Sequence, residues 1–368
     1  MPDSINSKNN NSKIYFPALT GLRAVAAFIV FLHHYPIQKK WVGSWGYSFF
    51  QELYIGVSIF FVLSGFLIYT RYADSIQFNK QWMFTYLKNR FARIYPIYFL
   101  LTIITFIYYW NSGNIYVIFN HEKWWTFIAN ITFIRGYFKD LLLTGVAQGW
   151  TLTVEETFYF TAPFLFIFIK KTNTFIVLLS LYLLGFLLYI LLNNDSFYGL
   201  FADISFVGYG TFFGRCFDFI VGIQLAIMYQ KNTLKVNKNN YFTFIGITFI
   251  CLVITCLIAV KGNEDFSFYG TKGLLINNFL LPPAIGILLW GLITEKTIIT
   301  SILSSKIFDV LGKSSYCFYM LHLGILSELL FSYVTHNYLF NFPIILLLSI
   351  GMYYFVEKPI ELWIKKRF

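Results

Sequence analysis

Charged residues are scarce in this 368-residue sequence: they make up 12% of the chain, whereas soluble globular domains carry about 25%. Apolar residues account for 57%. A soluble fold could not hide that much apolar surface, because roughly 55–60% of an ordinary folded surface is already apolar. The composition therefore excludes a soluble enzyme, a disordered protein and a nucleic-acid-binding domain. It favours a polytopic membrane protein with no room left for a large soluble domain.

Cysteine is also sparse, with four residues in the chain. All four lie in apolar stretches, and their spacing is not that of a zinc site or of a disulfide framework. We therefore expect no metal site and assign the four residues to packing: Cys216, Cys251, Cys256 and Cys317.

Long apolar runs take the place of the missing charge. About ten of them approach the roughly 20 residues that an α-helix needs to cross a bilayer, so we predict an all-α fold with about ten transmembrane helices. The shorter apolar segment 124–138 carries two tryptophans and is expected to be re-entrant or interfacial. The predicted spans are residues 17–36, 54–72, 94–111, 150–170, 174–193, 211–229, 242–260, 272–293, 316–335 and 339–357.

The distribution of lysine and arginine sets the expected orientation. With a cytoplasmic N-terminus, 19 of the 28 basic residues fall in cytoplasmic segments, seven in outer segments and two within spans. Such an excess is typical of cytoplasmic loops, and an even number of spans returns the C-terminus to the cytoplasm. We expect a polar N-terminal tail (1–16) that is not a cleavable signal, a transmembrane domain (17–358) and a short basic tail (359–368).

The first predicted span contains an arginine and two adjacent histidines. Arg23 and His34 are eleven residues apart, which is three helical turns plus about 20°, so they share one face about 16 Å apart along the axis. His33 falls about 80° off that face. A neutral histidine there suits a general base. The structural alternative is a pair of interfacial polar residues, with Arg23 extending its side chain toward water.

Two consecutive carboxylates, Glu155 and Glu156, open the fourth predicted span. Both cannot readily ionise in an apolar segment without partners. At the outer end of its span, a carboxylate would lie near His34 and could orient it. The alternative is helix capping, because acidic residues favour the first turn.

Paired arginines mark the cytoplasmic mouth of the third predicted span. Arg90 and Arg93 project from one helix face, and guanidinium groups bind phosphate in bidentate geometry. A phosphorylated donor would suit this pair. An ordinary cluster of positive charge on the inner side explains the pair equally well.

Other polar residues within spans are candidate pathway residues. Arg215 can pair with Asp218 three residues later, and a structural ion pair is the default for it. Ser64 precedes Gly65 in a small step suited to close helix packing. His322 lies in the ninth predicted span, where structural and pathway roles are both open.

Most of these candidate residues, but not Arg215, fall in stretches that resemble the acyltransferase-3 family of integral membrane O-acyltransferases. The stretches are GLRAVAAFIVFLHH, IGVSIFFVLSGF, RFARIYP, WTLTVEETFY, LGKSSYCFYMLH and FVEKPIE. They occur in the family's order across residues 17–362. Six stretches in order are a specific signature, although no single one is decisive.

The resemblance implies a bacterial multi-pass protein of the cytoplasmic (inner) membrane. Such a protein moves an acyl group, usually acetyl, from cytoplasmic acyl-CoA to a hydroxyl of a cell-envelope glycan, such as O-antigen or exopolysaccharide, or of a lipid-linked sugar. No tightly bound cofactor is implied, because acetyl-CoA is a substrate. Some members carry an extracytoplasmic domain after the last helix. We expect none here, so a separate partner enzyme would supply any second step.

The resemblance also assigns residues. Its Arg–His pair corresponds to Arg23 and His34, its R-x-x-R motif to Arg90 and Arg93 at the CoA phosphates, and its glutamate to Glu155. The mechanism so implied has His34, oriented by Glu155, deprotonate the sugar hydroxyl. A variant in which His34 first takes the acyl group stays open. The alternative functions are a glycolipid or small-solute transporter and a non-catalytic membrane subunit.

Overall fold

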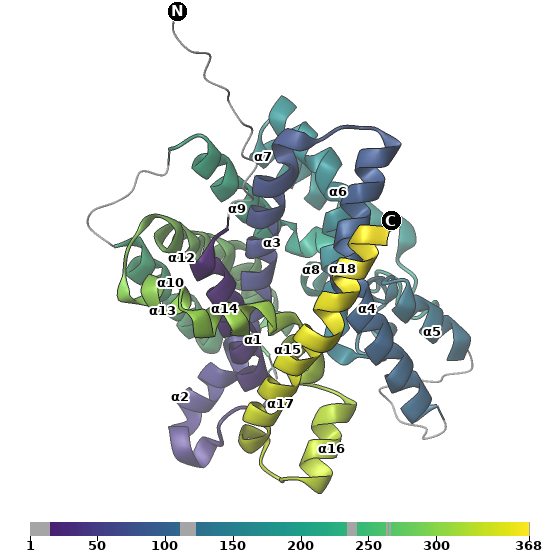
Figure 1. Cartoon of the computed structure of the whole chain (residues 1–368), viewed down its shortest axis with the longest axis vertical. Helices are drawn as coiled ribbons and strands as arrows, with labels where there is room; N and C mark the ends of the chain where they lie inside the picture. The colour runs from purple at the N-terminus through teal and green to yellow at the C-terminus, as the bar shows by residue number, and fades with distance from the viewer. Residues whose placement is uncertain (1–14, 111–122, 234–240, 263, 265, 368) are drawn as a thin grey trace, which may run out of the picture.

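A computed structural model describes residues 15–110, 123–233, 241–262, 264 and 266–367 (Figure 1). Most of the predicted N-terminal tail, residues 1–14, lies outside these ranges. Within them the chain is helical, and β structure is limited to isolated bridges of Leu200 with Phe138 and Asn194. The prediction of an all-α fold is confirmed.

Nine helical segments in the described ranges are long and apolar enough to cross a membrane, which makes this a multi-pass membrane protein. Eight of the ten predicted spans fall within one such segment each almost entirely, and a ninth, 94–111, overlaps the longer third segment. The segments are Pro17–His34, Lys39–Ser75, Lys80–Tyr109, Ala147–Lys171, Thr174–Leu192, Ile204–Gln230, Phe242–Val260, Thr271–Thr294 and Tyr338–Arg367. Their main helices are α1 (Pro17–His34), α2 (Lys39–Gln51), α3 (Gly56–Tyr72), α4 (Lys80–Tyr109), α6 (Trp150–Lys171), α7 (Thr174–Leu192), α8 (Ile204–Gly210), α9 (Phe212–Gln230), α10 (Phe242–Val260), α12 (Leu281–Thr294), α17 (Tyr338–Met352) and α18 (Lys358–Arg367).

The predicted span 316–335 is wrong. The chain there forms two short helices, α15 (Ser315–Leu321) and α16 (Ile325–Tyr333). Gly324 separates them with a φ of 86°, a left-handed conformation that glycine adopts without steric cost. Hydropathy does not register this turn, because the residues on both sides of the glycine are apolar.

The helix that carries the paired arginines begins earlier than predicted. α4 starts at Lys80, where the side chain of Asn79 caps it by accepting from the Trp82 amide at 2.7 Å. An asparagine at this position satisfies one of the amide groups that a helix start leaves unpaired. Arg90 and Arg93 therefore lie within a long helix rather than at its mouth.

The final helical segment continues past its predicted end at residue 357. After α17 the helix widens into a π-helical turn, Tyr353–Glu357, and then becomes α18. Pro359 lies just after this turn, where the wider helix accommodates a residue that has no amide proton. The basic residues of the predicted tail belong to α18, which crosses in front of the bundle in Figure 1.

The bundle is held at its centre by close packing of α3 and α9. A Cβ atom at Gly65 would meet the Phe219 carbonyl oxygen at 2.2 Å, and one at Gly222 would meet the Val62 carbonyl oxygen at 2.1 Å. Only glycine permits this approach, which is how helices commonly pack in membranes. The small Ser64–Gly65 step thus holds α3 against α9.

A connecting loop between α4 and α6 completes the framework. The segment 124–138, predicted to be re-entrant or interfacial, contains the short helix α5 (Lys123–Ile131) and a turn of 3-10 helix, Arg135–Tyr137. Arg135 is fully buried behind it and donates to the side chain of Asn130 at 2.8 Å and to the backbone oxygen of Val146 at 2.5 Å. This buried guanidinium orders the loop that leads into α6.

Candidate active site

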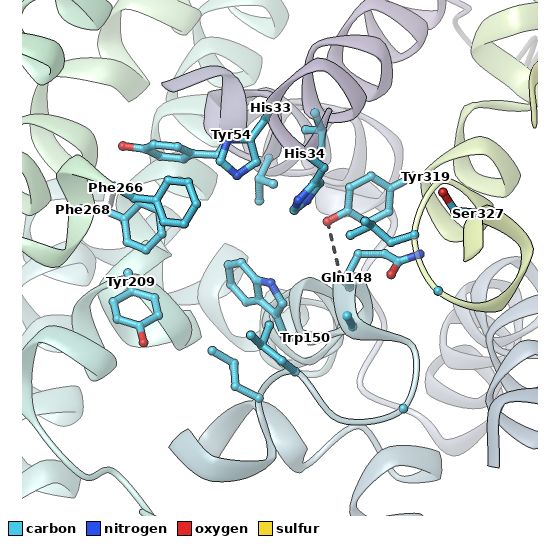
Figure 2. A pocket seen from close by; sticks show the side chains of 18 of the residues that line it. His33, His34, Tyr54, Gln148, Trp150, Tyr209, Phe266, Phe268, Tyr319 and Ser327 are labelled. Carbon is cyan, nitrogen blue, oxygen red and sulfur yellow. Dashed lines mark hydrogen bonds between the residues drawn. The ribbon is translucent and has the colours of Figure 1, made fainter. Parts of the chain in front are cut away.

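A cavity of about 980 Å³ opens at the C-terminal end of α1 (Figure 2). Its wall comes from α1, α3, the loop before α6, the segment before α9, residues 266–269 and the turn between α15 and α16. About a third of the lining residues are aromatic. The labelled aromatic side chains that face it are Tyr54, Trp150, Tyr209, Phe266, Phe268 and Tyr319.

The two histidines of α1 have different environments. His33 is 9% exposed, and its Nδ1 lies 2.6 Å from the Gln51 carbonyl oxygen. A carbonyl can only accept, so Nδ1 of His33 donates and the ring is committed to structure. His34 is exposed to the cavity, and its ring makes no hydrogen bond within the described residues. The chemistry of this cavity is therefore available to His34, on the face shared with Arg23.

Arg23 borders a second, much smaller cavity of about 40 Å³. Its guanidinium lies 5.9 Å from the ring centre of Phe60, and its Nε is buried without a hydrogen-bond partner in the described chain. The small cavity shares Val57 and Tyr319 with the large one. Arg23 and His34 thus line two adjoining spaces on one side of α1.

Glu155 lies at the small cavity, which differs from the expected pairing with His34. It accepts a short hydrogen bond from the Ser64 hydroxyl and one of 3.1 Å from the Tyr159 hydroxyl. The reason is the position of Glu155 along α6. The helix begins at Trp150, and Glu155, five residues later, lies about 7.5 Å farther along the helix axis. Trp150 itself lines the cavity of His34. The carboxylate lies beside Arg23.

Glu156 points to a different set of neighbours from Glu155. It lies within electrostatic range of Arg90 and Tyr86 on α4 and does not border either cavity. Adjacent residues of a helix are separated by about 100° around its axis, which accounts for the divergence. The sequence could not decide between Glu155 and Glu156 as the functional carboxylate. In the structure, only Glu155 borders a cavity.

The paired arginines also diverge. Arg90 is 4% exposed, donates to the Tyr72 hydroxyl at 3.2 Å, and lies 5.4 and 5.9 Å from the ring centres of Tyr72 and Tyr159. Arg93 is half-buried and lies within electrostatic range of Arg23 and of Glu357. Arg90 is thus enclosed by tyrosines, whereas Arg93 extends the charged cluster around Arg23.

Arg71 is a third arginine near Arg90 and Arg93, and it was not among the predicted site residues. It is exposed near the C-terminal end of α3 and lies within electrostatic range of both Arg90 and Arg93. The chain contains seven arginines. Their rarity is the sequence signal that could have marked Arg71 as a candidate beside Arg90 and Arg93.

The remaining candidate pathway residues have identifiable contacts. Arg215 forms a buried ion pair of 3.0 Å with Asp218 and donates to the Ser58 hydroxyl at 2.5 Å. Its side chain also reaches the wall of the large cavity. His322 is fully buried, and its ring centre lies 5.3 Å from that of His34. Nothing in the sequence links these two histidines, which lie in different predicted spans.

The aromatic wall was also missed. Phe, Trp and Tyr make up 22% of the sequence, so no local signal separates the residues that face the cavity from those that face lipid. Gln148, whose side chain donates to the Met320 carbonyl at 2.6 Å, was also missed, because a single glutamine before a predicted span carries no motif. Among the described residues, no three His, Cys, Asp or Glu side chains are grouped to hold a metal ion.

Fold and site together define a multi-pass helical membrane protein with a histidine-lined cavity and an adjoining charged pocket. The sequence profile of the acyltransferase-3 family, described as an acyltransferase domain, matches residues 16–356. The chain therefore belongs to the acyltransferase-3 family.

Several curated bacterial proteins are similar to this chain. O-acetyltransferase OatA of Staphylococcus aureus (strain NCTC 8325 / PS 47) is 24% identical over 371 residues, covering 94% of this chain and 57% of the relative. The same protein from strains COL and MRSA252 gives the same values. The chain thus spans 57% of the length of these relatives. No solved structure matches the chain.

Proposed function

We propose that the chain is an O-acetyltransferase that moves an acetyl group from cytoplasmic acetyl-CoA to a hydroxyl of a cell-envelope glycan. Support comes from family membership, from relatives named O-acetyltransferase, and above all from one observation. The pocket of Arg23 and the cavity of His34 adjoin at Val57 and Tyr319. A donor from one side and an acceptor from the other would meet at that boundary.

The large cavity suits a sugar. Aromatic faces carry partial negative charge and pack well against the C–H faces of pyranose rings. Polar groups on the same wall, including Gln148, Asp140 and the paired Lys139 and Asp203, could hold ring hydroxyls. A mainly apolar wall with a few polar groups is typical of specific small-molecule sites. The proposed acceptor is the end of a surface polysaccharide or a lipid-linked sugar.

His34 acts as the general base in this proposal. It takes the proton from the acceptor hydroxyl while the hydroxyl oxygen attacks the thioester carbonyl carbon. The C–S bond breaks, the ester forms, and the proton passes to the departing CoA thiolate. In the covalent variant, His34 carries the acetyl group first and the sugar hydroxyl attacks it afterwards.

Arginines serve the donor in this proposal. Arg71 and Arg93 can meet CoA phosphates at the inner end of α3 and α4, since they are the more accessible members of the cluster. Arg90 then positions Tyr72 and Tyr159 rather than binding phosphate alone. Arg23, next to the small cavity, is suited to polarise the thioester carbonyl.

The proposed setting is the bacterial cytoplasmic membrane with both termini inside. The nine long segments of the described ranges give an odd number of crossings, and the short stretch 312–322 would supply the tenth, because Gly312 packs against Thr20 near the start of α1 and His322 lies beside His34 at its end. This orientation puts the cluster of Arg71 and Arg93 in contact with the cytoplasm and puts the cavity of His34 toward the envelope. Any further transfer step outside the membrane would fall to a separate partner enzyme. The helices themselves contact lipid through exposed apolar side chains such as Phe186, Leu191 and Leu347.

The deciding experiment measures transfer of labelled acetyl from acetyl-CoA into glycan in isolated membranes. His34→Ala is compared with wild type at matched expression, and His336→Ala serves as control because His336 is exposed and does not line either cavity. Labelled glycan from wild type and the control, but not from His34→Ala, supports the proposal. Equal labelling by all three removes His34 from the mechanism. No labelling by any, with several acyl-CoA donors tested, favours the transporter alternative.

A further inference from the structure

His322 is buried next to the cavity at the break between α15 and α16. None of its surface is exposed, and its ring packs parallel to that of Phe318 with ring centres 6.4 Å apart. A polar ring in such a place costs free energy unless its nitrogen atoms have partners. The two nitrogen atoms of His322 differ in this respect.

The protonation of His322 follows from its one hydrogen bond. Nδ1 lies 2.6 Å from the Tyr319 carbonyl oxygen, which can only accept, so Nδ1 carries the proton. In the neutral ring Nε2 then offers a lone pair. Nε2 is buried and has no hydrogen-bond partner within the described residues. Buried polar atoms are nearly always paired, so an unpaired one calls for an explanation.

His34 is the neighbour able to use this lone pair. The two ring centres are 5.3 Å apart, tilted by 40°, a spacing at which ring nitrogen atoms that point toward each other lie within hydrogen-bond range. Glu155, the orienting group expected from the sequence, is occupied by Ser64 and Tyr159. His322 therefore holds the position that the carboxylate was expected to fill.

The backbone around His322 is tied to α1. Tyr35, the residue after His34, donates to the His322 carbonyl oxygen at 3.0 Å, and its hydroxyl also lies 2.7 Å from the Ser327 hydroxyl. The turn at Gly324 brings both of these groups to the end of α1. A fixed spacing between the two imidazoles is what an orienting contact requires.

We propose that His322 is a positioning residue for His34. Its Nε2 accepts the N–H of His34, which leaves the other nitrogen of His34 unprotonated and facing the acceptor hydroxyl. When His34 takes the proton of that hydroxyl, the resulting imidazolium keeps its N–H on Nε2 of His322. The proton then goes to the thiolate of the leaving CoA. This inference rests on the proposed general-base role of His34.

The test compares four variants by initial rates of acetyl transfer from acetyl-CoA. His322→Phe keeps the ring shape and removes both nitrogen atoms. His322→Gln can place an amide oxygen near Nε2, whereas His322→Asn reaches only the position of Nδ1. His336→Gln is the matched control at an exposed histidine. Purified variants are first compared for monodispersity in detergent.

The expected result is a loss in kcat with little change in the KM for acetyl-CoA. His322→Phe should lose about 100-fold in kcat, the lower end of what acid–base groups contribute. His322→Gln should exceed His322→Asn by about 10-fold, as expected for one hydrogen bond. A purely structural role would lower both amide variants alike. If His322→Phe does not fold, the kcat of His322→Gln relative to that of His322→Asn still tests the positioning role.

The outcomes separate this inference from the proposed function. Equal kcat for the glutamine and asparagine variants, or full activity of His322→Phe while His34→Ala is inactive, overturns the role of His322 alone. Full activity of His34→Ala overturns the general-base role and this inference with it. Absence of acetyl transfer by the wild-type protein also overturns both.

Discussion

The two adjoining cavities differ in size and in lining. The large cavity, about 980 Å³, is lined by many aromatic rings and by His33 and His34. The small cavity, about 40 Å³, has room for only a few water molecules. Arg23, Glu155 and the hydroxyl of Ser64 lie on its wall together with apolar side chains.

The difference suggests a division of labour. An open cavity with many aromatic side chains can admit a bulky acceptor through shape and stacking. A narrow pocket with fixed charges can instead stabilise charge that develops on a thioester oxygen, because preorganised groups in a low dielectric act strongly. The comparison implies that substitutions at the two cavities should affect different substrates.

The largest expected effect comes from Glu155→Gln. It removes the carboxylate beside Arg23, so kcat/KM for acetyl-CoA should fall about 100-fold, within the range for a hydrogen bond to a charged group. The KM for the acceptor should stay unchanged. Glu156→Gln, on the adjacent residue, should change little. A rise in acceptor KM with Glu155→Gln would instead restore the His34–Glu155 pairing and break the division between the cavities.

A substitution in the wall of the large cavity should change the KM for the acceptor and leave that for acetyl-CoA unchanged. Trp150→Ala removes an aromatic face from the large cavity, and the acceptor KM should rise about 10-fold, as for the loss of an aromatic contact. The acetyl-CoA KM should not move. Trp41→Ala, at a tryptophan that is 75% exposed outside both cavities, provides the control. Equal changes for both substrates would show that the two cavities act as one site.

Ser64→Ala should lower the free energy of unfolding, because Ser64 lies at the small cavity beside Glu155. Glu155 would lose the Ser64 hydroxyl and keep that of Tyr159, which should destabilise the protein by about 1.5 kcal/mol, as for a hydrogen bond to a charged group. Thermal unfolding in detergent measures this. Ser180→Ala, where an exposed hydroxyl donates to the Ile176 carbonyl oxygen of its own helix, should be near neutral. An equally stable Ser64→Ala protein would mean that the serine serves packing alone.

The smallest effect concerns the ion pair between Lys139 and Asp203 in the wall of the large cavity. Burial raises the pKa of Asp203, but hydrogen bonds from Lys139 and from the Phe206 amide outweigh burial and leave the pKa below its usual 3.8. The pair then stabilises the fold above pH 3.8 and ceases to do so as the pH falls through the lowered pKa.

Lys139→Met should reveal that pH dependence. Both partners are about half exposed, so the loss at pH 7 should be below about 0.5 kcal/mol. The difference in unfolding midpoint from wild type should vanish as Asp203 becomes protonated at low pH. Lys139→Arg should retain the pairing. A difference that persists undiminished below the lowered pKa would show that the lysine acts through packing.

Sequence patterns predicted most of the helical segments because hydropathy measures what a bilayer demands of a helix. They failed at Gly324, where a single φ breaks an apolar run. They also placed the start of the third span at residue 94, although α4 begins at Lys80. The first turns of that helix carry Lys80, Lys88 and Arg90 among apolar residues, and these charges lower the local hydropathy below that of a membrane span.

The face shared by Arg23 and His34 was determined by the sequence alone, since helical periodicity depends only on spacing along one chain segment. Partners across helices were decided by the tertiary structure. Whether Glu155 meets His34 or Arg23, and whether His322 approaches His34, depends on the depth at which helices meet and on a turn after α15. Those quantities arise from packing between distant segments, which no local pattern encodes.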